Sequence, residues 1–102
     1  MNQIVENNIN EIKKLCDKHL VEKMFLFGSA NTSLFNEKSD VDFLISFKNS
    51  LLLMDYADNY FDLKDSLNDI LKRKVDLVVE KSLKNPYFKK EIDETKVLIY
   101  GA

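Results

Sequence analysis

Apolar residues alternate along this chain between short continuous runs and longer segments with helical spacing. The continuous runs have the length of buried strands and cover residues 24–27, 41–47, 75–79 and 97–100. Apolar spacings of three and four residues predict helices over residues 4–20 and 53–70. Asn85-Pro86 is typical of a helix start, with asparagine as the N-cap and proline in the first turn, and predicts a third, short helix that extends through Ile92. This alternation predicts an α/β or α+β fold, with one sheet and helices packed against it.

Length and composition fit a single globular domain over residues 1–102, since 45% of the residues are hydrophobic and 31% are charged. A formal net charge of -2 provides no basic field, so we expect no direct nucleic-acid partner. No apolar run approaches the roughly 20 residues that span a bilayer, so we expect no membrane partner. The first ten residues lack the charged-then-apolar layout of a signal peptide, and we therefore expect a cytoplasmic location.

Cysteine and histidine are too scarce to carry the common kinds of catalysis. Cys16 is the only cysteine, which excludes an intramolecular disulfide and a cysteine-rich zinc site. It falls on the apolar stripe of the first predicted helix, so we expect this side chain in the core. His19 is the only histidine, which argues against histidine-pair metal sites and Ser-His-Asp catalysis. We expect His19 at the surface or in a capping role near the end of the first helix. Carboxylates are therefore the predicted agents of any chemistry.

Asp40 and Asp42 stand at the entrance to the second apolar run. Side chains two residues apart on a strand share a face, so both carboxylates point away from Val41 and lie about 5–7 Å apart. Two such charges repel unless a cation lies between them, and Mg²⁺ takes one or two carboxylates together with substrate phosphates. The alternative is a solvated strand entrance with two surface aspartates.

Asp76 occupies the equivalent place in the third apolar run, within the stretch KVDLVVE. Aspartate is disfavoured in strands, and a carboxylate near a core is costly unless it is paired or bound to a metal. If the two strands are neighbours, three carboxylates converge at one end of the sheet. The alternative is an ordinary ion pair between Asp76 and Lys72, Arg73 or Lys74.

Gly28-Ser29 follows the first apolar run. Glycine allows the backbone to turn sharply at a strand end, and the serine hydroxyl and nearby amides suit phosphate oxygens. A lone Gly-Ser is usually a simple turn. Combined with the carboxylates that follow at a fixed interval, it is typical of half of a nucleoside-triphosphate site.

Together these motifs resemble the minimal nucleotidyltransferases of the DNA polymerase beta-like nucleotidyltransferase superfamily. The resemblance is carried by Gly28-Ser29, by Ser39-Asp40-Val41-Asp42 and by Val75-Asp76-Leu77-Val78, and it extends over nearly the whole chain. It implies a small mixed β-sheet flanked by helices. It also implies two Mg²⁺ ions and transfer of a nucleotidyl group from a triphosphate, with ATP as the expected donor and pyrophosphate as the product.

The resemblance also implies a role for individual residues. Asp40 and Asp42 would bind the metals, and Asp76 would bind the catalytic metal and help deprotonate the attacking hydroxyl. The residues expected to hold the nucleotide are Gly28, Ser29 and Ser39.

Many similar minimal nucleotidyltransferases are antitoxins that bind a HEPN-domain ribonuclease toxin and adenylylate it on tyrosine. The resemblance therefore implies an antitoxin that transfers AMP to a tyrosine of a HEPN partner. This chain has Thr32 and Ser33 where members often have arginine and glycine. That departure keeps open a catalytically weak or inactive binding module that neutralises a toxin by occlusion. A second alternative is a small-molecule adenylyltransferase of the antibiotic-modifying type.

The basic run Lys72–Lys74 follows the second long helix. Cations suit the negative end of a helix dipole, so we expect a solvated helix end, with contact to a phosphate or a partner as the alternative.

Overall fold

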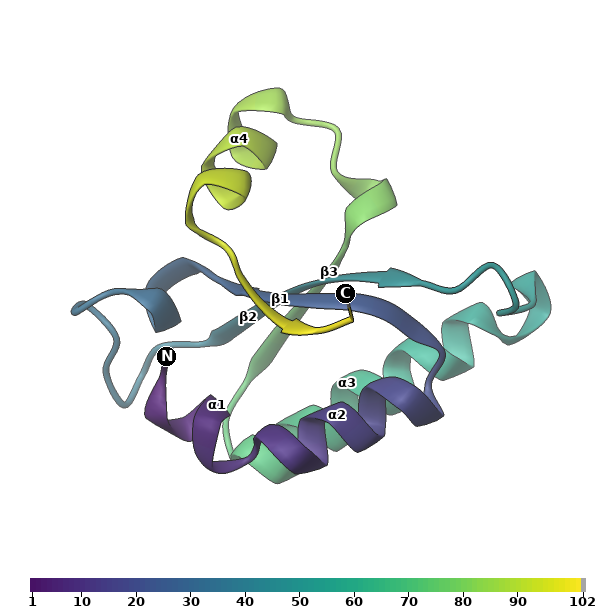
Figure 1. Ribbon diagram of the computed structural model, residues 1–102, viewed down its shortest axis with the longest axis horizontal. Helices are drawn as coiled ribbons and strands as arrows, with labels where there is room; N and C mark the ends of the chain where they lie inside the picture. Colours follow the sequence, from purple (N-terminus) through teal and green to yellow (C-terminus); the bar gives the residue numbers. More distant parts are fainter. Residues whose placement is uncertain (102) are drawn as a thin grey trace.

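The four apolar runs form one four-stranded sheet in the computed structural model, which describes residues 1–101 (Figure 1). The strands are β1 (Val21–Phe27), β2 (Val41–Phe47), β3 (Val75–Val79) and β4 (Val97–Tyr100). Their order across the sheet is β3-β2-β1-β4. β1 pairs antiparallel with both β2 and β4, whereas β2 and β3 are parallel. The predicted α+β fold with a small mixed sheet is therefore confirmed.

The helices are α1 (Gln3–Asn7), α2 (Ile9–Lys18), α3 (Tyr56–Leu71) and α4 (Pro86–Thr95). The single helix predicted over residues 4–20 is divided at Asn8, whose side-chain amide donates to the Ile4 carbonyl at 2.8 Å and closes α1. Asparagine competes with the helical backbone for such bonds, which explains the break. Leu20 then adopts a left-handed backbone with φ 58°, and β1 begins three residues earlier than predicted.

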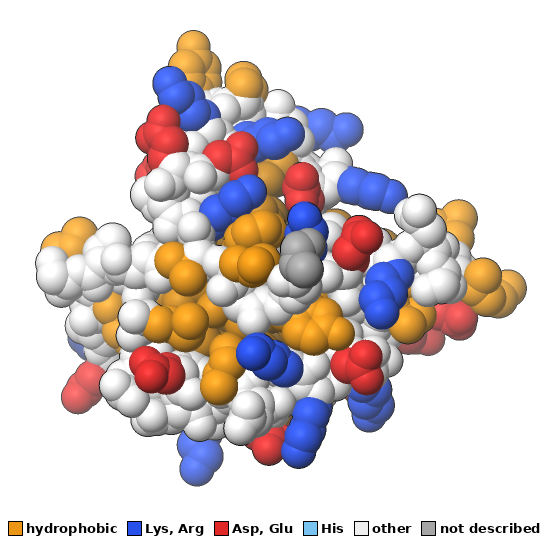
Figure 2. All heavy atoms as spheres, in the orientation of Figure 1, with side chains coloured by type: hydrophobic (Ala, Val, Ile, Leu, Met, Phe, Trp, Pro, Cys, Tyr) orange, Lys and Arg blue, Asp and Glu red, His pale blue; other side chains and the backbone are white. Residues whose placement is uncertain are grey.

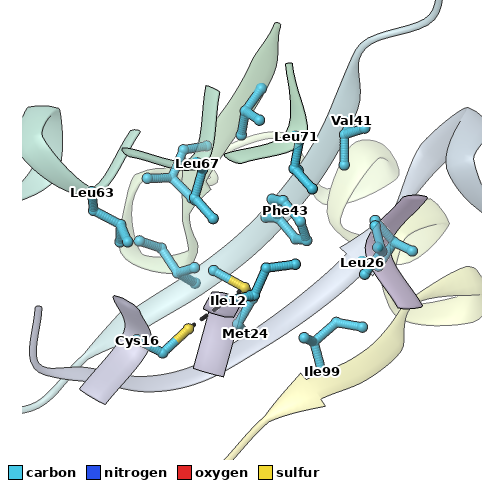
Figure 3. Packing of buried hydrophobic residues seen from close by; sticks show 14 of the residues in the cluster. Ile12, Cys16, Met24, Leu26, Val41, Phe43, Leu63, Leu67, Leu71 and Ile99 are labelled. Carbon is cyan, nitrogen blue, oxygen red and sulfur yellow. Dashed lines mark hydrogen bonds between the residues drawn. The ribbon is translucent and has the colours of Figure 1, made fainter. Parts of the chain in front are cut away.

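The larger core lies between one face of the sheet and the helices α1–α3 (Figure 1). Alternate residues of each strand point into this core, as the two-residue period of a strand requires. In the close-up, the labelled side chains of α2, α3 and the strands point toward one another, and the Cys16 thiol lies 3.7 Å from the Met24 sulfur (Figure 3). Burial raises the pKa of the Cys16 thiol to about 12, which fits its predicted place in the core.

The opposite face of the sheet is covered only by α4 and the short segment that precedes it (Figure 1). Its small apolar cluster joins Phe27 of β1, Leu44 of β2 and Ile92 of α4. Leu44 and Asp42 are two positions apart on β2, so Asp42 also faces α4 rather than the larger core. The thinly covered face of the sheet therefore carries the candidate carboxylates.

The surface seen in Figure 2 has acidic and basic side chains interspersed, in keeping with the small net charge of -2. Within residues 1–101, no helix has both the length and the apolar character that crossing a membrane requires.

Of the two predicted roles of His19, the capping role is confirmed, because it occupies the C-cap of α2. It is not at the surface, since only 2% of the residue is exposed. Its Nδ1 lies 2.7 Å from the Leu15 carbonyl, and its Nε2 lies 2.5 Å from Oδ2 of Asp62 on α3. Each ring nitrogen lies within hydrogen-bond distance of an oxygen, so the imidazole is held at both of its polar positions. The contact between His19 and Asp62 therefore links the C-terminal end of α2 to α3.

Replacing Asp62 with asparagine should lower the Tm at about pH 7, because buried His19 loses its charged partner. The hydrogen bond from His19 lowers the pKa of Asp62. Ionised Asp62 therefore stabilises the folded protein at pH values above the ordinary aspartate pKa of about 3.9. This stabilisation is lost as the pH falls through the lowered pKa that Asp62 has in the folded state. The two proteins should thus converge in Tm at about pH 2, as followed by circular dichroism. The exposed Asp65→Asn control should match the wild type, and an unchanged Tm in Asp62→Asn at neutral pH would contradict this role.

Candidate active site

Asp42 and Asp76 lie directly opposite each other on neighbouring strands. The parallel register pairs Val41 with Val75 and Asp42 with Asp76 at the point where β2 and β3 begin. Val41, Val75 and the next inward pair, Phe43 and Leu77, point into the larger core, so both aspartates emerge on the α4 side. The predicted meeting of the two strands is confirmed, with Asp42 and Asp76 opposite each other, whereas Asp40 precedes β2 and does not join the facing pair.

Gly28 lies directly against Asp42, one of the two facing carboxylates. Its φ of +75° lies in the left-handed region, and a Cβ at this position would come 2.4 Å from Oδ2 of Asp42. Only glycine fits both the backbone conformation and the space. The turn Gly28–Asn31 that follows is a short 3-10 helix, so Ser29 stands at the same end of the sheet as Asp42. The Gly-Ser turn and the carboxylates therefore form one local arrangement.

The carboxylates experience mutual repulsion. Burial, together with the negative charges of Asp76 and Asp40, raises the pKa of Asp42 to about 6. Among the ion pairs of residues 1–101, none involves Asp42 or Asp76. The sequence-based alternative of an ion pair for Asp76 is therefore not what the structure contains. Two facing carboxylates without a positive partner, one half-buried (Asp42) and one exposed (Asp76), are a donor set that suits a hard divalent cation.

Asp40 is placed slightly apart from the facing pair. It precedes β2, is partly exposed, and its Oδ2 lies 3.8 Å from Nζ of Lys74. Val41 between the two aspartates is fully buried, which agrees with their predicted common face. Over the described residues, no three acidic, histidine or cysteine side chains are close enough together to form a metal cage. The arrangement fits an ion whose remaining ligands come from a substrate, which is how Mg²⁺ commonly binds.

A small pocket of about 190 Å³ opens beside the carboxylates. The sheet contributes Phe27, Gly28, Asp42 and Asp76 to its lining. The other wall is α4, through Phe88, Glu91, Ile92 and Thr95. Sequence reasoning located this helix but missed its place over the site. The available signal was its apolar spacing, because Phe88 and Ile92 lie four residues apart on one face.

Ser39 and Asp40 do not line this pocket, and neither does Ser29. The Ser39 hydroxyl accepts a hydrogen bond from the Asn36 amide at 3.0 Å, so it closes its own loop. The role of Ser39 in holding a nucleotide stays a prediction.

Thr32 and Asn31 stabilise the Gly-Ser turn through side-chain hydrogen bonds to backbone carbonyls. The Thr32 hydroxyl donates to the Ser29 carbonyl at 2.9 Å and accepts the Leu34 amide at 3.2 Å. The side-chain amide of Asn31 donates to the Leu26 carbonyl at 2.8 Å and to the Thr95 carbonyl of α4 at 3.2 Å. The position where similar sequences often have arginine thus holds the turn by neutral hydrogen bonds.

Comparisons with known proteins agree with this geometry. The sequence profile of the family described as "Polymerase beta, Nucleotidyltransferase" matches residues 10–102. A Methanocaldococcus jannaschii protein named "Putative protein adenylyltransferase" is 40% identical over 87 residues, which cover 85% of this chain and 85% of the relative.

Solved structures have the same fold. One described as "Structure of putative minimal nucleotidyltransferase" superposes with a TM-score of 0.72 at 27% identity, over 91% of this chain and 90% of that one. A chain from the complex of tri-AMPylated Shewanella oneidensis HEPN toxin with MNT antitoxin superposes with a TM-score of 0.65 at 21% identity, over 95% of this chain and 72% of that one. The second likeness is one of fold.

Replacing Asp42 with asparagine should stabilise the protein when divalent cations are absent. The raised pKa of Asp42 means that its ionised form opposes folding, so the wild type loses stability as the pH rises from about 4 to above its folded pKa of about 6. After discounting for solvent exposure, we expect the variant to be more stable by roughly 1–2 kcal/mol at about pH 8 and equal at about pH 4.

Thermal unfolding of both proteins in EDTA measures this difference. Adding Mg²⁺ should raise the Tm of the wild type more than that of Asp42→Asn, because bound ions stabilise only the folded state that holds them. Exposed Asp69→Asn is the matched control and should show neither effect. An Asp42→Asn variant that is less stable than the wild type at about pH 8 would refute the assigned repulsion.

Proposed function

The chain belongs to the polymerase beta nucleotidyltransferase family, and on that premise we propose that it is a protein adenylyltransferase that transfers AMP from ATP to a hydroxyl group of a partner protein. The observation that carries this proposal is the facing pair Asp42 and Asp76 beside the Gly28 turn. It joins the two things that nucleotidyl transfer needs, namely anionic ligands for cations and a backbone turn for phosphates.

In the proposed reaction, the acceptor oxygen attacks the α-phosphorus of ATP. A new phosphorus–oxygen bond forms, the bond to the β-phosphate bridging oxygen breaks, and pyrophosphate leaves with that electron pair. Asp76 takes up the proton of the attacking hydroxyl. When bound by Asp40, Asp42 and Asp76, two Mg²⁺ ions would supply the positive charge that stabilises the attacking and leaving oxygens.

The Gly28-Ser29 turn is the proposed seat of the triphosphate. Gly28 lets the backbone approach closely because it has no side chain, and Ser29 adds a hydroxyl and an amide at the start of the turn. Thr32 and Asn31 hold the turn in place, so its donors are preorganised before the nucleotide arrives. Because residue 32 is threonine and carries no charge, the negative charge of the phosphates would be balanced by the metal ions.

The proposed acceptor is a tyrosine of a HEPN-domain toxin, which would make the chain an antitoxin. Support for a protein acceptor comes from the 40% identical relative, which is named for protein adenylylation. Support for the HEPN partner comes from the shared fold with a chain of the HEPN–MNT complex. The cytoplasm, where ATP is abundant and a free cysteine such as Cys16 stays reduced, is the compartment we propose.

Labelling of a partner with ATP that is radioactive at its α-phosphorus tests this proposal. We expect Asp76→Asn to lower labelling of a co-encoded HEPN protein by more than about a hundred-fold, since loss of a metal ligand exceeds the 10–100-fold typical of its outer partners. Exposed Asp93→Asn on α4 should label as the wild type does. Equal labelling by Asp76→Asn would overturn the mechanism.

Thr32 favours one second candidate, namely an inactive antitoxin that neutralises its toxin by covering it. The discriminating variant is Asp42→Asn, which removes a proposed metal ligand and leaves the outer surface unchanged. If transfer of AMP is the function, this variant should no longer protect cells that express the toxin. Full protection by Asp42→Asn, with the partner unlabelled, would favour occlusion.

A further inference from the structure

The loop from Thr32 to Asp40 links the two halves of the site without regular secondary structure. It runs from the Gly-Ser turn to the first of the carboxylates. Its own hydrogen bonds are local, since Ser39 donates its amide to the Asn36 carbonyl at 3.0 Å and Lys38 donates to the Asn36 side chain at 2.8 Å. Such bonds close a turn within residues 36–39 but do not attach that turn to the sheet.

Arg73 supplies the attachment. It lies between α3 and β3, three residues before Asp76, and one nitrogen of its guanidinium donates to two carbonyls of the loop. The distances are 3.1 Å to Asn36 and 2.8 Å to Ser39. The guanidinium also lies over the ring of Phe35, 4.7 Å from its centroid. Arg73 therefore holds the loop at both ends of its turn and by its one partly buried aromatic side chain.

Lys74, the next residue, contacts the start of β2 and the aspartate that precedes it. The Lys74 carbonyl accepts the Val41 amide at 3.1 Å, and the Lys74 ammonium faces Asp40. The segment that leads to Asp76 is thereby bound to the segment that leads to Asp40 and Asp42. The expected solvated helix end at Lys72–Lys74 is correct for Lys72, which is exposed, but wrong for Arg73.

We propose that Arg73 is a positioning residue, which fixes the loop before Asp40 so that Asp40 and Asp42 face Asp76 at the separation that metal and nucleotide binding require. Arg73 does not line the pocket beside the carboxylates, and it acts through backbone carbonyls. The planar guanidinium is suited to this task because it is always charged, donates in fixed directions and stacks on an aromatic ring. A lysine ammonium has enough donors for both carbonyls, but it is not planar, so it could not stack flat on the Phe35 ring, and its flexible stem would not hold the donors in fixed directions. This inference rests on the proposed function and refines its site.

The first test compares the Mg²⁺ dependence of AMP transfer in Arg73→Ala, Arg73→Lys and the control Lys72→Ala. We expect Arg73→Ala to need about ten-fold more Mg²⁺ for half-maximal rate, the scale of a lost outer partner of a metal ligand, and to recover kcat at saturating Mg²⁺. Arg73→Lys should recover little of the wild-type Mg²⁺ dependence. Lys72→Ala should match the wild type. An Arg73→Ala enzyme with a lower Tm but an unchanged half-saturating Mg²⁺ would show a merely structural role and overturn the proposal.

The second test does not require activity. Amide hydrogen exchange should be faster at residues 36–40 in Arg73→Ala than in the wild type, and unchanged in Lys72→Ala. Binding of Mn²⁺ alone, followed by electron paramagnetic resonance, should weaken in parallel. If the wild type transfers no AMP, the proposed function fails while exchange and Mn²⁺ binding still decide the role of Arg73. Unchanged exchange at residues 36–40 would overturn it in either case.

Discussion

The parallel pairing of β2 with β3 is the contact on which the candidate site depends. The same register that buries Val41 beside Val75, and Phe43 beside Leu77, places Asp42 opposite Asp76 on the other face. Each buried apolar side chain contributes about 1.5–3 kcal/mol, which offsets the roughly 1–2 kcal/mol that it costs to keep Asp42 ionised, half-buried and beside Asp76. The apolar face of the strands thus holds in place two charges that would separate if they were free.

The unequal covering of the sheet explains how this site stays reachable. α1–α3 bury one face completely enough to stabilise the domain, whereas α4 touches the other through a cluster centred on Phe27, Leu44 and Ile92. The carboxylates emerge beside this small cluster, where α4 forms only one wall of the pocket. One face of the strands therefore provides most of the buried core, while the opposite face leaves the carboxylates accessible to a ligand.

The connections around the site are held mainly by hydrogen bonds to backbone carbonyls. Asn31 ties the Gly-Ser turn to β1 and to the end of α4, Thr32 closes the turn, and Arg73 attaches the following loop to the start of β3. These segments are too polar and too short to be fixed by burial. A nucleotidyltransferase site needs its ligands in fixed positions before substrate arrives, so this network substitutes for the rigidity that a core would provide.

The sequence by itself predicted the element types, one sheet with helices packed against it, and the candidate site residues Gly28, Asp42 and Asp76, whereas the mixed character of the sheet was implied by the family resemblance. These depend on residues close together in the chain, namely apolar spacing, a glycine at a strand end and aspartates at strand entrances. The tertiary structure alone decided that α4 covers the site, that Asp62 is the partner of His19 and that Arg73 holds the Ser39 carbonyl. The last two contacts join residues 43 and 34 positions apart. Local periodicity carries no information about such pairs, because strand order and helix packing bring them together only when the whole chain has folded.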